Sequence, residues 1–190
     1  MKTMSLPTSR SEQNNIASIK IENVSKQFPV NGGELSVLDN ISLDVKSGEI
    51  LAIVGRSGSG KSTLLNIISG LEKATTGQVS VHGSVGYVPQ KDLLLPWRTV
   101  VGNILLPAEI KKANLKTSVI KARDLLRKNG LGDFEKSYPS EISGGMRQKV
   151  SLIRTLLQDS DIVLFDEPFS AIDFDARLQL VKEVRSYIVS

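Results

Sequence analysis

Cysteine is absent from this 190-residue sequence, and histidine and tryptophan occur once each, as His82 and Trp97. Without cysteine the chain can form no disulfide, no thiolate metal site and no cysteine nucleophile. No apolar stretch approaches the length that spans a bilayer, and the polar tail 1–18 lacks the apolar core of a secretory signal. If this protein works at a membrane, we expect it to reach that membrane by binding a partner.

Charge is nearly balanced, with 24 lysine and arginine residues against 20 aspartate and glutamate residues and a formal net charge of +4. The segment 111–128 is an exception, because Asp124 is its acidic residue and its basic residues are Lys111, Lys112, Lys116, Lys121, Arg123, Arg127 and Lys128. Such a run is typical of the solvated face of a helix. An anionic membrane surface and a nucleic acid are the alternative explanations.

One stretch carries a specific chemical pattern. After the apolar run Ile50–Val54 the loop consists of Gly55, Arg56, Ser57, Gly58, Ser59, Gly60, Lys61, Ser62 and Thr63. It fits the phosphate-binding pattern G-x-x-x-x-G-K-[ST], between a predicted buried strand and a predicted helix that stops at Gly70. The sequence therefore predicts a site for a nucleoside triphosphate.

The residue types of this loop suit a triphosphate. Glycines permit backbone angles at which successive N–H groups surround phosphate oxygens, and the start of the following helix adds partial positive charge. Lys61 can reach the β- and γ-phosphates, and the Ser62 hydroxyl can ligate Mg²⁺. We therefore expect ATP and Mg²⁺ to bind here.

Around the loop the pattern is that of an α/β protein. Alternating apolar residues predict strands at 19–24, 38–45, 78–81 and 85–88, the last two joined by a His82-Gly83 turn that exposes the histidine. From about 91 to 140 the periodicity is helical, with helices at 100–110 and 115–126. This segment is expected to form a helical sub-lobe inserted into the α/β core. Further helices are predicted after Ser143 and at 178–188.

The apolar strand Ile162–Phe165 ends in Asp166-Glu167. A carboxylate at the carboxyl end of a strand lies where α/β sheets bind ligands, so Asp166 is expected to hold Mg²⁺. Glu167 is suited to polarise the attacking water. A carboxylate pair that only caps a strand is the alternative.

Between the two motifs lies Ile142-Ser143-Gly144-Gly145-Met146. In this order the three motifs resemble those of the ATP-binding cassette (ABC) transporter family, whose signature is Leu-Ser-Gly-Gly-Gln. The resemblance implies that Ser143, Gly144 and Gly145 reach the γ-phosphate bound by a second ATPase subunit in a head-to-tail homodimer. Ile142 and Met146 depart from the signature, and Met146 lacks its amide side chain.

The same resemblance assigns further residues. Gln90 matches the glutamine that ligates Mg²⁺ and links the ATP site to the helical lobe, so that Glu167, Gln90 and Lys61 are the expected catalytic residues. Asp173 matches the residue expected at the dimer seam, and Phe28 the aromatic that stacks on adenine, although core packing explains Phe28 nearly as well. The resemblance implies a P-loop NTPase core of the ABC ATPase type, with an antiparallel β sub-lobe and an inserted α-helical sub-lobe.

One departure concerns the end of the sequence. The family carries a histidine after a further strand. In a parallel sheet a crossover helix is followed by another strand, but no strand is predicted after the helix at 178–188. We therefore expect residues 19–190 to be a truncated ABC ATPase domain without that strand and histidine region. A nucleotide-binding module with little ATPase activity is an alternative interpretation.

The run 94–104, with Trp97 within it, resembles the importer branch for nitrate, alkanesulfonates and taurine. This implies an ATPase subunit peripheral on the cytoplasmic face of the membrane, bound to transmembrane permease subunits and served indirectly by a solute-binding protein. Trp97 and Leu95 then face a partner or, alternatively, the core of the sub-lobe. A soluble ABC-type ATPase acting on nucleic acid is also possible, but the tandem cassettes or long insertions of such proteins are absent from this sequence, and no nucleic acid is expected.

Overall fold

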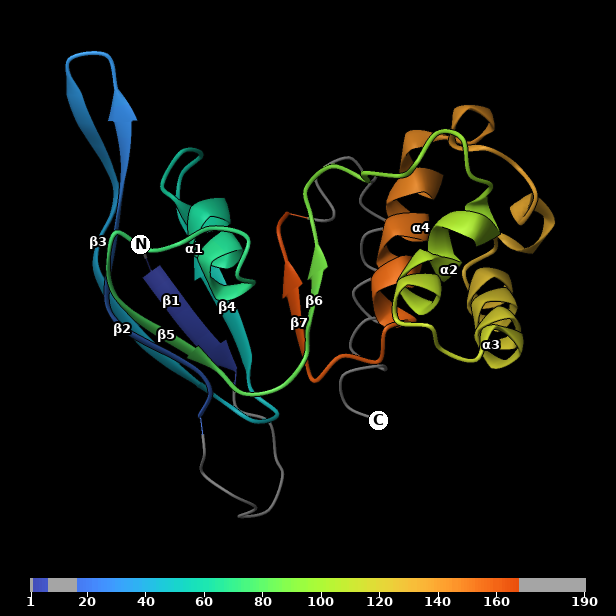
Figure 1. Cartoon of the computed structure of the whole chain (residues 1–190), viewed down its shortest axis with the longest axis horizontal. Helices are drawn as coiled ribbons and strands as arrows, with labels where there is room; N and C mark the ends of the chain where they lie inside the picture. Colours follow the sequence, from blue (N-terminus) through green and yellow to red (C-terminus); the bar gives the residue numbers. More distant parts are fainter. Residues whose placement is uncertain (1, 7–16, 168–190) are drawn as a thin grey trace. The chain divides into compact units, whose positions relative to one another are not determined.

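The computed structural model describes residues 2–6 and 17–167 (Figure 1). The chain divides into two compact units, an N-terminal unit up to Ser84 and a C-terminal unit from Val85, and each is described by itself. Asp173 and the helix predicted at 178–188 lie outside the described residues.

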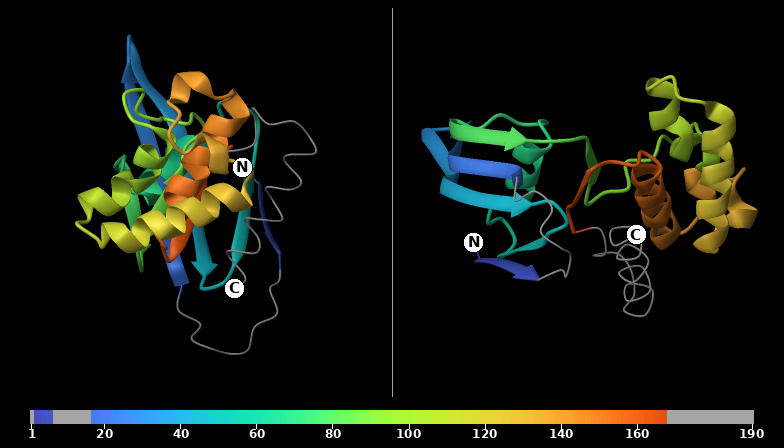
Figure 2. Two further views of the ribbon diagram at one scale, coloured as in Figure 1. Left: turned by 90° about the vertical axis from the view of Figure 1, so that its right-hand side faces the viewer. Right: turned by 90° about the horizontal axis from the view of Figure 1, so that it is seen from below.

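The N-terminal unit is built on a long antiparallel hairpin. Strands β2 (Ala17–Val30) and β3 (Gly33–Lys46) pair along their length, and β5 (Thr76–Val81) pairs with the other edge of β2 (Figures 1 and 2). The predicted alternation is confirmed, because the buried apolar residues of β2 and β3 are Ile19, Ile21, Val24, Leu38 and Val45. This antiparallel sheet is the β sub-lobe expected from the sequence.

The strand before the phosphate loop, β4 (Ile50–Val54), pairs antiparallel with β1 (Lys2–Leu6). No strand is predicted at residues 2–6 from the sequence, which assigns 1–18 to a polar tail. The prediction of a buried strand at β4 is wrong for the described residues, since Val54 is 57% exposed. The physical reason is that β1 is the one strand paired with β4 in the part of the chain that the structure describes.

Helix α1 (Lys61–Ile68) follows the loop and contacts β3 and β5. Its buried residues, Leu64, Leu65, Ile67 and Ile68, form an apolar face of helical spacing. Gly70 adopts a φ of +78° directly after the helix, and its N–H donates to the Ile67 carbonyl over 3.1 Å. The predicted glycine stop is therefore confirmed.

The C-terminal unit contains a parallel strand pair. Strands β6 (Val85–Val88) and β7 (Ile162–Phe165) lie side by side, with Val88 opposite Phe165 (Figure 1). The predicted strands at 78–81 and 85–88 exist, but the predicted hairpin between them is wrong. β5 pairs with the second edge of the 14-residue strand β2, and β6 pairs with the apolar strand β7, so the two strands around the His82 turn belong to different sheets.

Three helices pack together in this unit: α2 (Val100–Ile110), α3 (Leu115–Lys128) and α4 (Gly144–Leu156) (Figures 1 and 2). Two short 3₁₀ turns, Gly132–Phe134 and Pro139–Glu141, connect α3 to α4. Their shared core consists of Val100, Ile104, Ala122, Leu126, Leu131, Ile142, Val150 and Ile153. None of the helices in the described residues is both long and apolar enough to cross a membrane.

Candidate functional site

The phosphate loop leads into the N-terminus of α1 in a conformation suited to binding an anion. Gly58 and Gly60 have φ values of +77° and +87°, which turn the chain in a way that residues with a side chain rarely adopt. Gly60 is the N-cap of α1 and supplies no side chain to cap it, and the first turn contains no acidic residue. The first N–H groups of α1 therefore point out of the helix without a side-chain acceptor from the cap.

Two polar side chains lie within this loop. The Lys61 ammonium donates to the Gly55 carbonyl over 3.0 Å and to the Arg56 carbonyl over 3.1 Å, so it spans the loop. The Ser59 hydroxyl oxygen is buried and has no hydrogen-bond partner among the described residues. A Cβ atom at Gly55 would lie 2.5 Å from that oxygen, so a larger residue would displace Ser59. Loop and lysine together fit a polyphosphate.

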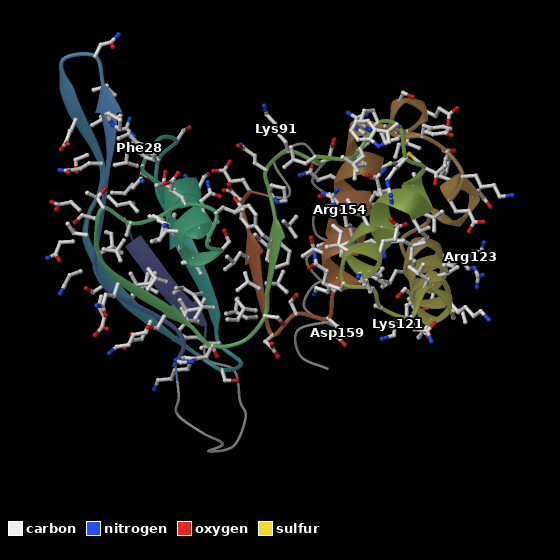
Figure 3. All side chains as sticks on the ribbon, in the orientation of Figure 1. Phe28, Lys91, Lys121, Arg123, Arg154 and Asp159 are labelled. Atoms are coloured by element: carbon white, nitrogen blue, oxygen red, sulfur yellow. The ribbon has the colours of Figure 1, made fainter. Side chains whose placement is uncertain are left out.

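Phe28 lies on β2 in the same unit as the phosphate loop. Its side chain (Figure 3) is half-buried. The Lys26 ammonium lies 4.7 Å from the centre of its ring, within the range of a cation–π interaction. Lys26 also pairs with Glu72 over 2.7 Å. The ring is thus not a member of the fully buried core, and its expected stacking on adenine stays a prediction.

Asp166 follows directly on β7 and is almost fully buried, with 6% of its surface exposed. Its Oδ2 accepts a hydrogen bond from the Tyr87 hydroxyl over 3.1 Å, and its N–H donates to the Val88 carbonyl. Burial, with the negative charge and the hydrogen bond of Asp166 as further causes, raises the pKa of Tyr87 to about 12. The tyrosine therefore stays a hydrogen-bond donor to this carboxylate at neutral pH.

Glu167 and Gln90 come together at the carboxyl ends of β6 and β7. The Gln90 amide Nε2 donates to Glu167 Oε2 over 3.4 Å. Glu167 adopts a φ of +47°, a conformation that costs energy for a residue other than glycine and that is frequent at functional sites. The structure thus brings together Gln90 and Glu167, two of the three residues predicted to be catalytic, and Asp166 directly precedes Glu167 after β7.

The signature residues begin α4. Ser143 is its N-cap, and the Ser143 hydroxyl accepts a hydrogen bond from the Met146 N–H over 3.2 Å. Ser143 and Gly144 are exposed, and a Cβ atom added at Gly145 would meet no atom within 4 Å. Met146, which replaces the amide of the family signature, packs against the apolar core of the three helices. Its side chain therefore acts through packing in this unit.

The basic segment 111–128 covers the exposed side of α3 and the turn before it. Arg123 pairs with Glu135 over 2.9 Å and Lys128 with Asp124 over 2.8 Å, while Lys111, Lys112, Lys116 and Lys121 are exposed (Figure 3). This is the arrangement of a solvated helix face.

Sequence reasoning missed a set of contacts made by α4. Arg147, Gln148, Arg154 and Thr155 all donate to the segment 87–93, which contains Gln90. A signal exists in the sequence, because these polar residues recur at the spacing of one helix face while the remaining residues of α4 are largely apolar.

Mg²⁺ was expected at Ser62, Gln90 and Asp166. The described residues hold no cluster of three or more histidine, cysteine or acidic side chains of the kind that forms an all-protein metal cage. The buried carboxylate of Asp166, the Ser62 hydroxyl and the Gln90 amide oxygen are each oxygen donors of the type that Mg²⁺ takes, and this ion typically uses one or two protein oxygens plus phosphate and water. Ser62 belongs to the N-terminal unit, and Gln90 and Asp166 to the C-terminal unit.

Comparison with curated proteins finds ABC transporter subunits. The chain is 41% identical over 174 residues to the ABC transporter ATP-binding protein MJ0412 of Methanocaldococcus jannaschii, a match covering 87% of this chain and 65% of the relative. It is 39% identical over 171 residues to the aliphatic sulfonates import ATP-binding protein SsuB of Bacillus cereus, covering 86% and 67%. It is 38% identical to the bicarbonate transport ATP-binding protein CmpD of a Synechocystis strain, covering 94% and 67%. The chain thus spans about two thirds of the length of these relatives.

Solved structures give the same family. The dimeric structure of the bacterial ABC transporter cassette MJ0796 has a TM-score of 0.84 at 30% identity, over 90% of this chain and 82% of that one. A post-hydrolysis state of the same cassette, bound to ADP and Pi, matches equally well. A sequence model of the family described as "ABC transporter" matches residues 38–170. The chain therefore belongs to the ABC transporter family, as an ATP-binding cassette of the ATPase type.

Proposed function

We propose that this chain is the ATP-hydrolysing subunit of a bacterial ABC importer for a small solute such as nitrate, a sulfonate or taurine. In this proposal residues 19–190 form one ABC ATPase domain whose helical sub-lobe spans about 91–140. The observation that carries the proposal is the loop Gly55–Thr63, with its left-handed glycines, its spanning lysine and the buried Ser59 hydroxyl at the start of α1. The names of two relatives, which refer to sulfonates and bicarbonate, support a small anionic solute.

Binding and catalysis divide among named residues. The loop amides and Lys61 hold the phosphates, and the Lys61 ammonium exchanges its loop carbonyls for the β- and γ-phosphate oxygens. Glu167 accepts a proton from the attacking water, and Gln90 orients that carboxylate through its amide. Ser62, Gln90 and Asp166 would hold Mg²⁺, which would supply positive charge to the phosphate oxygens.

The signature residues serve a second copy of the chain in this proposal. Neither Gly144 nor Gly145 has a positive φ, and a Cβ atom at either would meet nothing closer than 3.6 Å. Packing within the unit therefore does not require these glycines, but the close approach of another molecule would. Ser143, Gly144, Gly145 and Asp173 are the proposed contacts across a homodimer, and MJ0796 is such a dimeric cassette.

The partners and the location follow from the same proposal. Trp97 is 71% exposed in the segment after Gln90, so it lies outside the core of its unit and is available to transmembrane permease subunits. The chain would act as a peripheral protein on the cytoplasmic face of the membrane, with a solute-binding protein involved indirectly. Co-purification with a permease subunit, compared with retention on DNA or ribosomes, tests this part.

Phosphate release by the full chain in MgATP tests the catalytic part. Glu167→Gln should lower the hydrolysis rate by about 100-fold or more, because the general base is lost, while ATP still binds. Asp133→Asn, a change of the same kind at an exposed carboxylate, is the matched control and should leave the rate unchanged. Equal rates for the wild type and Glu167→Gln would contradict the proposed role of Glu167. ATP binding without hydrolysis by the wild type would favour a nucleotide-binding module.

A further inference from the structure

The end of α2 and the start of α3 expose large aliphatic side chains among lysines. Ile110 is 72% exposed, and Leu115 and Ile120 are 47% and 71% exposed. Single exposed aliphatic residues are ordinary on a protein surface, but here three lie in one short stretch of chain. We call residues 110–121 the α3 patch. Its lysines are Lys111, Lys112, Lys116 and Lys121.

The charge of the α3 patch is not used to hold the unit together. Its four lysines are exposed, and none of them takes part in an ion pair within the described ranges 2–6 and 17–167. Farther along α3, by contrast, Arg123 pairs with Glu135 over 2.9 Å. The first turn of α3 contains Lys116 and no acidic residue, which is the unfavourable arrangement for the helix dipole. These lysines therefore contribute little to the stability of the helix.

The backbone of the α3 patch has a defined shape. The Ala113 N–H donates to the Ala108 carbonyl over 2.9 Å and closes the turn between α2 and α3. Asn114 then caps α3, because its Oδ1 accepts the N–H groups of Lys116 and Thr117 over 3.1 and 3.4 Å. The aliphatic side chains are thus presented by a turn and a helix whose hydrogen bonds are already made.

Helix α3 packs on the core with its other face. Ala122 and Leu126 are buried in the cluster that the three helices share, whereas Ile120 is outside it. Lys116 precedes Ile120 by four residues, so the two side chains are neighbours on the exposed face. Lys121 directly follows Ile120 in the sequence. The exposed face of α3 therefore places an aliphatic side chain between two ammonium groups.

This combination of side chains fits the surface of an anionic bilayer. Lysine ammonium groups are attracted to anionic headgroups, their hydrocarbon stems can lie along apolar surface, and aliphatic side chains enter the boundary between headgroups and acyl chains. A single-stranded nucleic acid is bound instead with aromatic side chains on which bases stack, and the sequence 110–121 contains no aromatic residue.

We propose that the α3 patch binds the headgroup surface of an anionic lipid bilayer, with its lysines at the headgroup phosphates and Ile110, Leu115 and Ile120 in the interfacial layer. This goes beyond the proposed function, in which partner subunits bring the chain to the membrane. The two share the location at the membrane, but neither nucleotide nor hydrolysis enters the lipid contact.

Sedimentation of the full chain with vesicles tests the charged part. The wild type should bind vesicles of equal parts phosphatidylcholine and phosphatidylglycerol, and should not bind phosphatidylcholine alone. Lys116→Gln with Lys121→Gln should weaken binding about 25-fold, or about fivefold for each lysine, and glutamine preserves helix propensity. Lys91→Gln with Lys136→Gln is the matched control, because it removes the same charge at exposed positions outside the patch. Figure 3 shows Lys91 well separated from Lys121.

A fluorescent label tests the aliphatic part. Because the sequence contains no cysteine, Ile120→Cys can carry a single polarity-sensitive fluorophore. Its emission should shift to shorter wavelength on the anionic vesicles, since the side chain leaves water. Leu71→Cys is the matched control, because Leu71 is 70% exposed and lies in the N-terminal unit, and its emission should stay unchanged.

Three results would overturn the proposal: a wild type that does not bind the anionic vesicles, an equal loss of binding in the control double variant, or equal emission changes at positions 71 and 120. Retention on DNA that falls in the Lys116→Gln, Lys121→Gln variant, without vesicle binding, would assign the patch to nucleic acid. ATP hydrolysis measured without vesicles separates this inference from the proposed function. A chain that binds vesicles but hydrolyses no ATP defeats only the proposed function, and the reverse result defeats only the lipid contact.

Discussion

The N-termini of α1 and α4 are both proposed to contact phosphate, but their N-cap residues differ. At α1 the N-cap is Gly60, in a left-handed conformation and without a side chain. At α4 the N-cap is Ser143, in an extended conformation, and its hydroxyl accepts the Met146 N–H. The N-cap of α1 therefore satisfies no N–H group with a side chain, whereas the N-cap of α4 satisfies one.

This difference favours the N-terminus of α1 over that of α4 as the proposed primary phosphate site within one chain. A helix start capped by glycine instead of a polar side chain gives up roughly a few tenths of a kcal/mol, which a tightly bound anion can replace. A helix whose N-terminus is capped by its own side chain needs no ligand for stability. In the proposed dimer, a phosphate bound by the other subunit contacts it only when the dimer forms. The two also differ in charge, because Lys61 lies within the first turn of α1 whereas the first turn of α4 begins with two glycines.

The largest expected effect comes from a substitution at the N-terminus of α1. Lys61→Ala should weaken the binding of a fluorescent ATP analogue at least 100-fold, or by about 2.7 kcal/mol, because charge-assisted hydrogen bonds to the phosphates are lost. Equilibrium titration measures this, with Lys73→Ala as a control of the same type at an exposed position. Wild-type affinity in Lys61→Ala would show that α1 is not the primary site.

A second change tests whether the left-handed cap is required. Gly60→Ala should lower the free energy of unfolding by about 2 kcal/mol, because φ is +87° and the new Cβ atom would lie 2.8 Å from Leu38 Cδ2 and 2.9 Å from the Val37 carbonyl. Gly58→Ala is the matched control, since φ is +77° there but nothing lies within 4 Å, and it should cost about 1 kcal/mol. Urea unfolding curves measure both, and equal losses would argue against the close approach at Gly60.

At α4 the expected effect is smaller. Ser143→Ala should reduce stability by about 1 kcal/mol through loss of the cap, and Ser143→Asp should restore it because aspartate caps as well as serine. Aspartate would also repel a phosphate, so Ser143→Asp should be stable yet deficient in nucleotide-dependent dimerisation. Thermal unfolding and sedimentation measure the two properties. If both variants dimerise like the wild type, Ser143 is a cap and not a ligand.

The same contrast explains what the sequence could predict. The phosphate loop, α1 and the helices α2 to α4 were predictable, because each rests on a pattern within a few residues: glycine spacing, helical periodicity and caps such as Ser143. Strand partners were not. The hairpin predicted at His82 failed because β6 pairs with β7, more than 70 residues away. The polar face of α4 is visible in the sequence, but the partner of that face is not, since Arg154 and Leu93 are 61 residues apart.

The smallest expected effect concerns Tyr87, whose hydroxyl donates a hydrogen bond to the Asp166 carboxylate. Because its pKa is raised from 10.0 to about 12 in the folded state, the folded chain binds the phenolic proton more tightly than the unfolded chain does. This contribution to stability is fully present below about pH 10 and is lost as the pH rises toward 12. Absorbance of tyrosinate should show one tyrosine titrating near pH 12, and Tyr87→Phe should remove that step alone. A step near pH 10 in the folded wild type would mean that Tyr87 does not donate to Asp166, and the carboxylate at the end of β7 would then lose a hydrogen bond that helps to orient it.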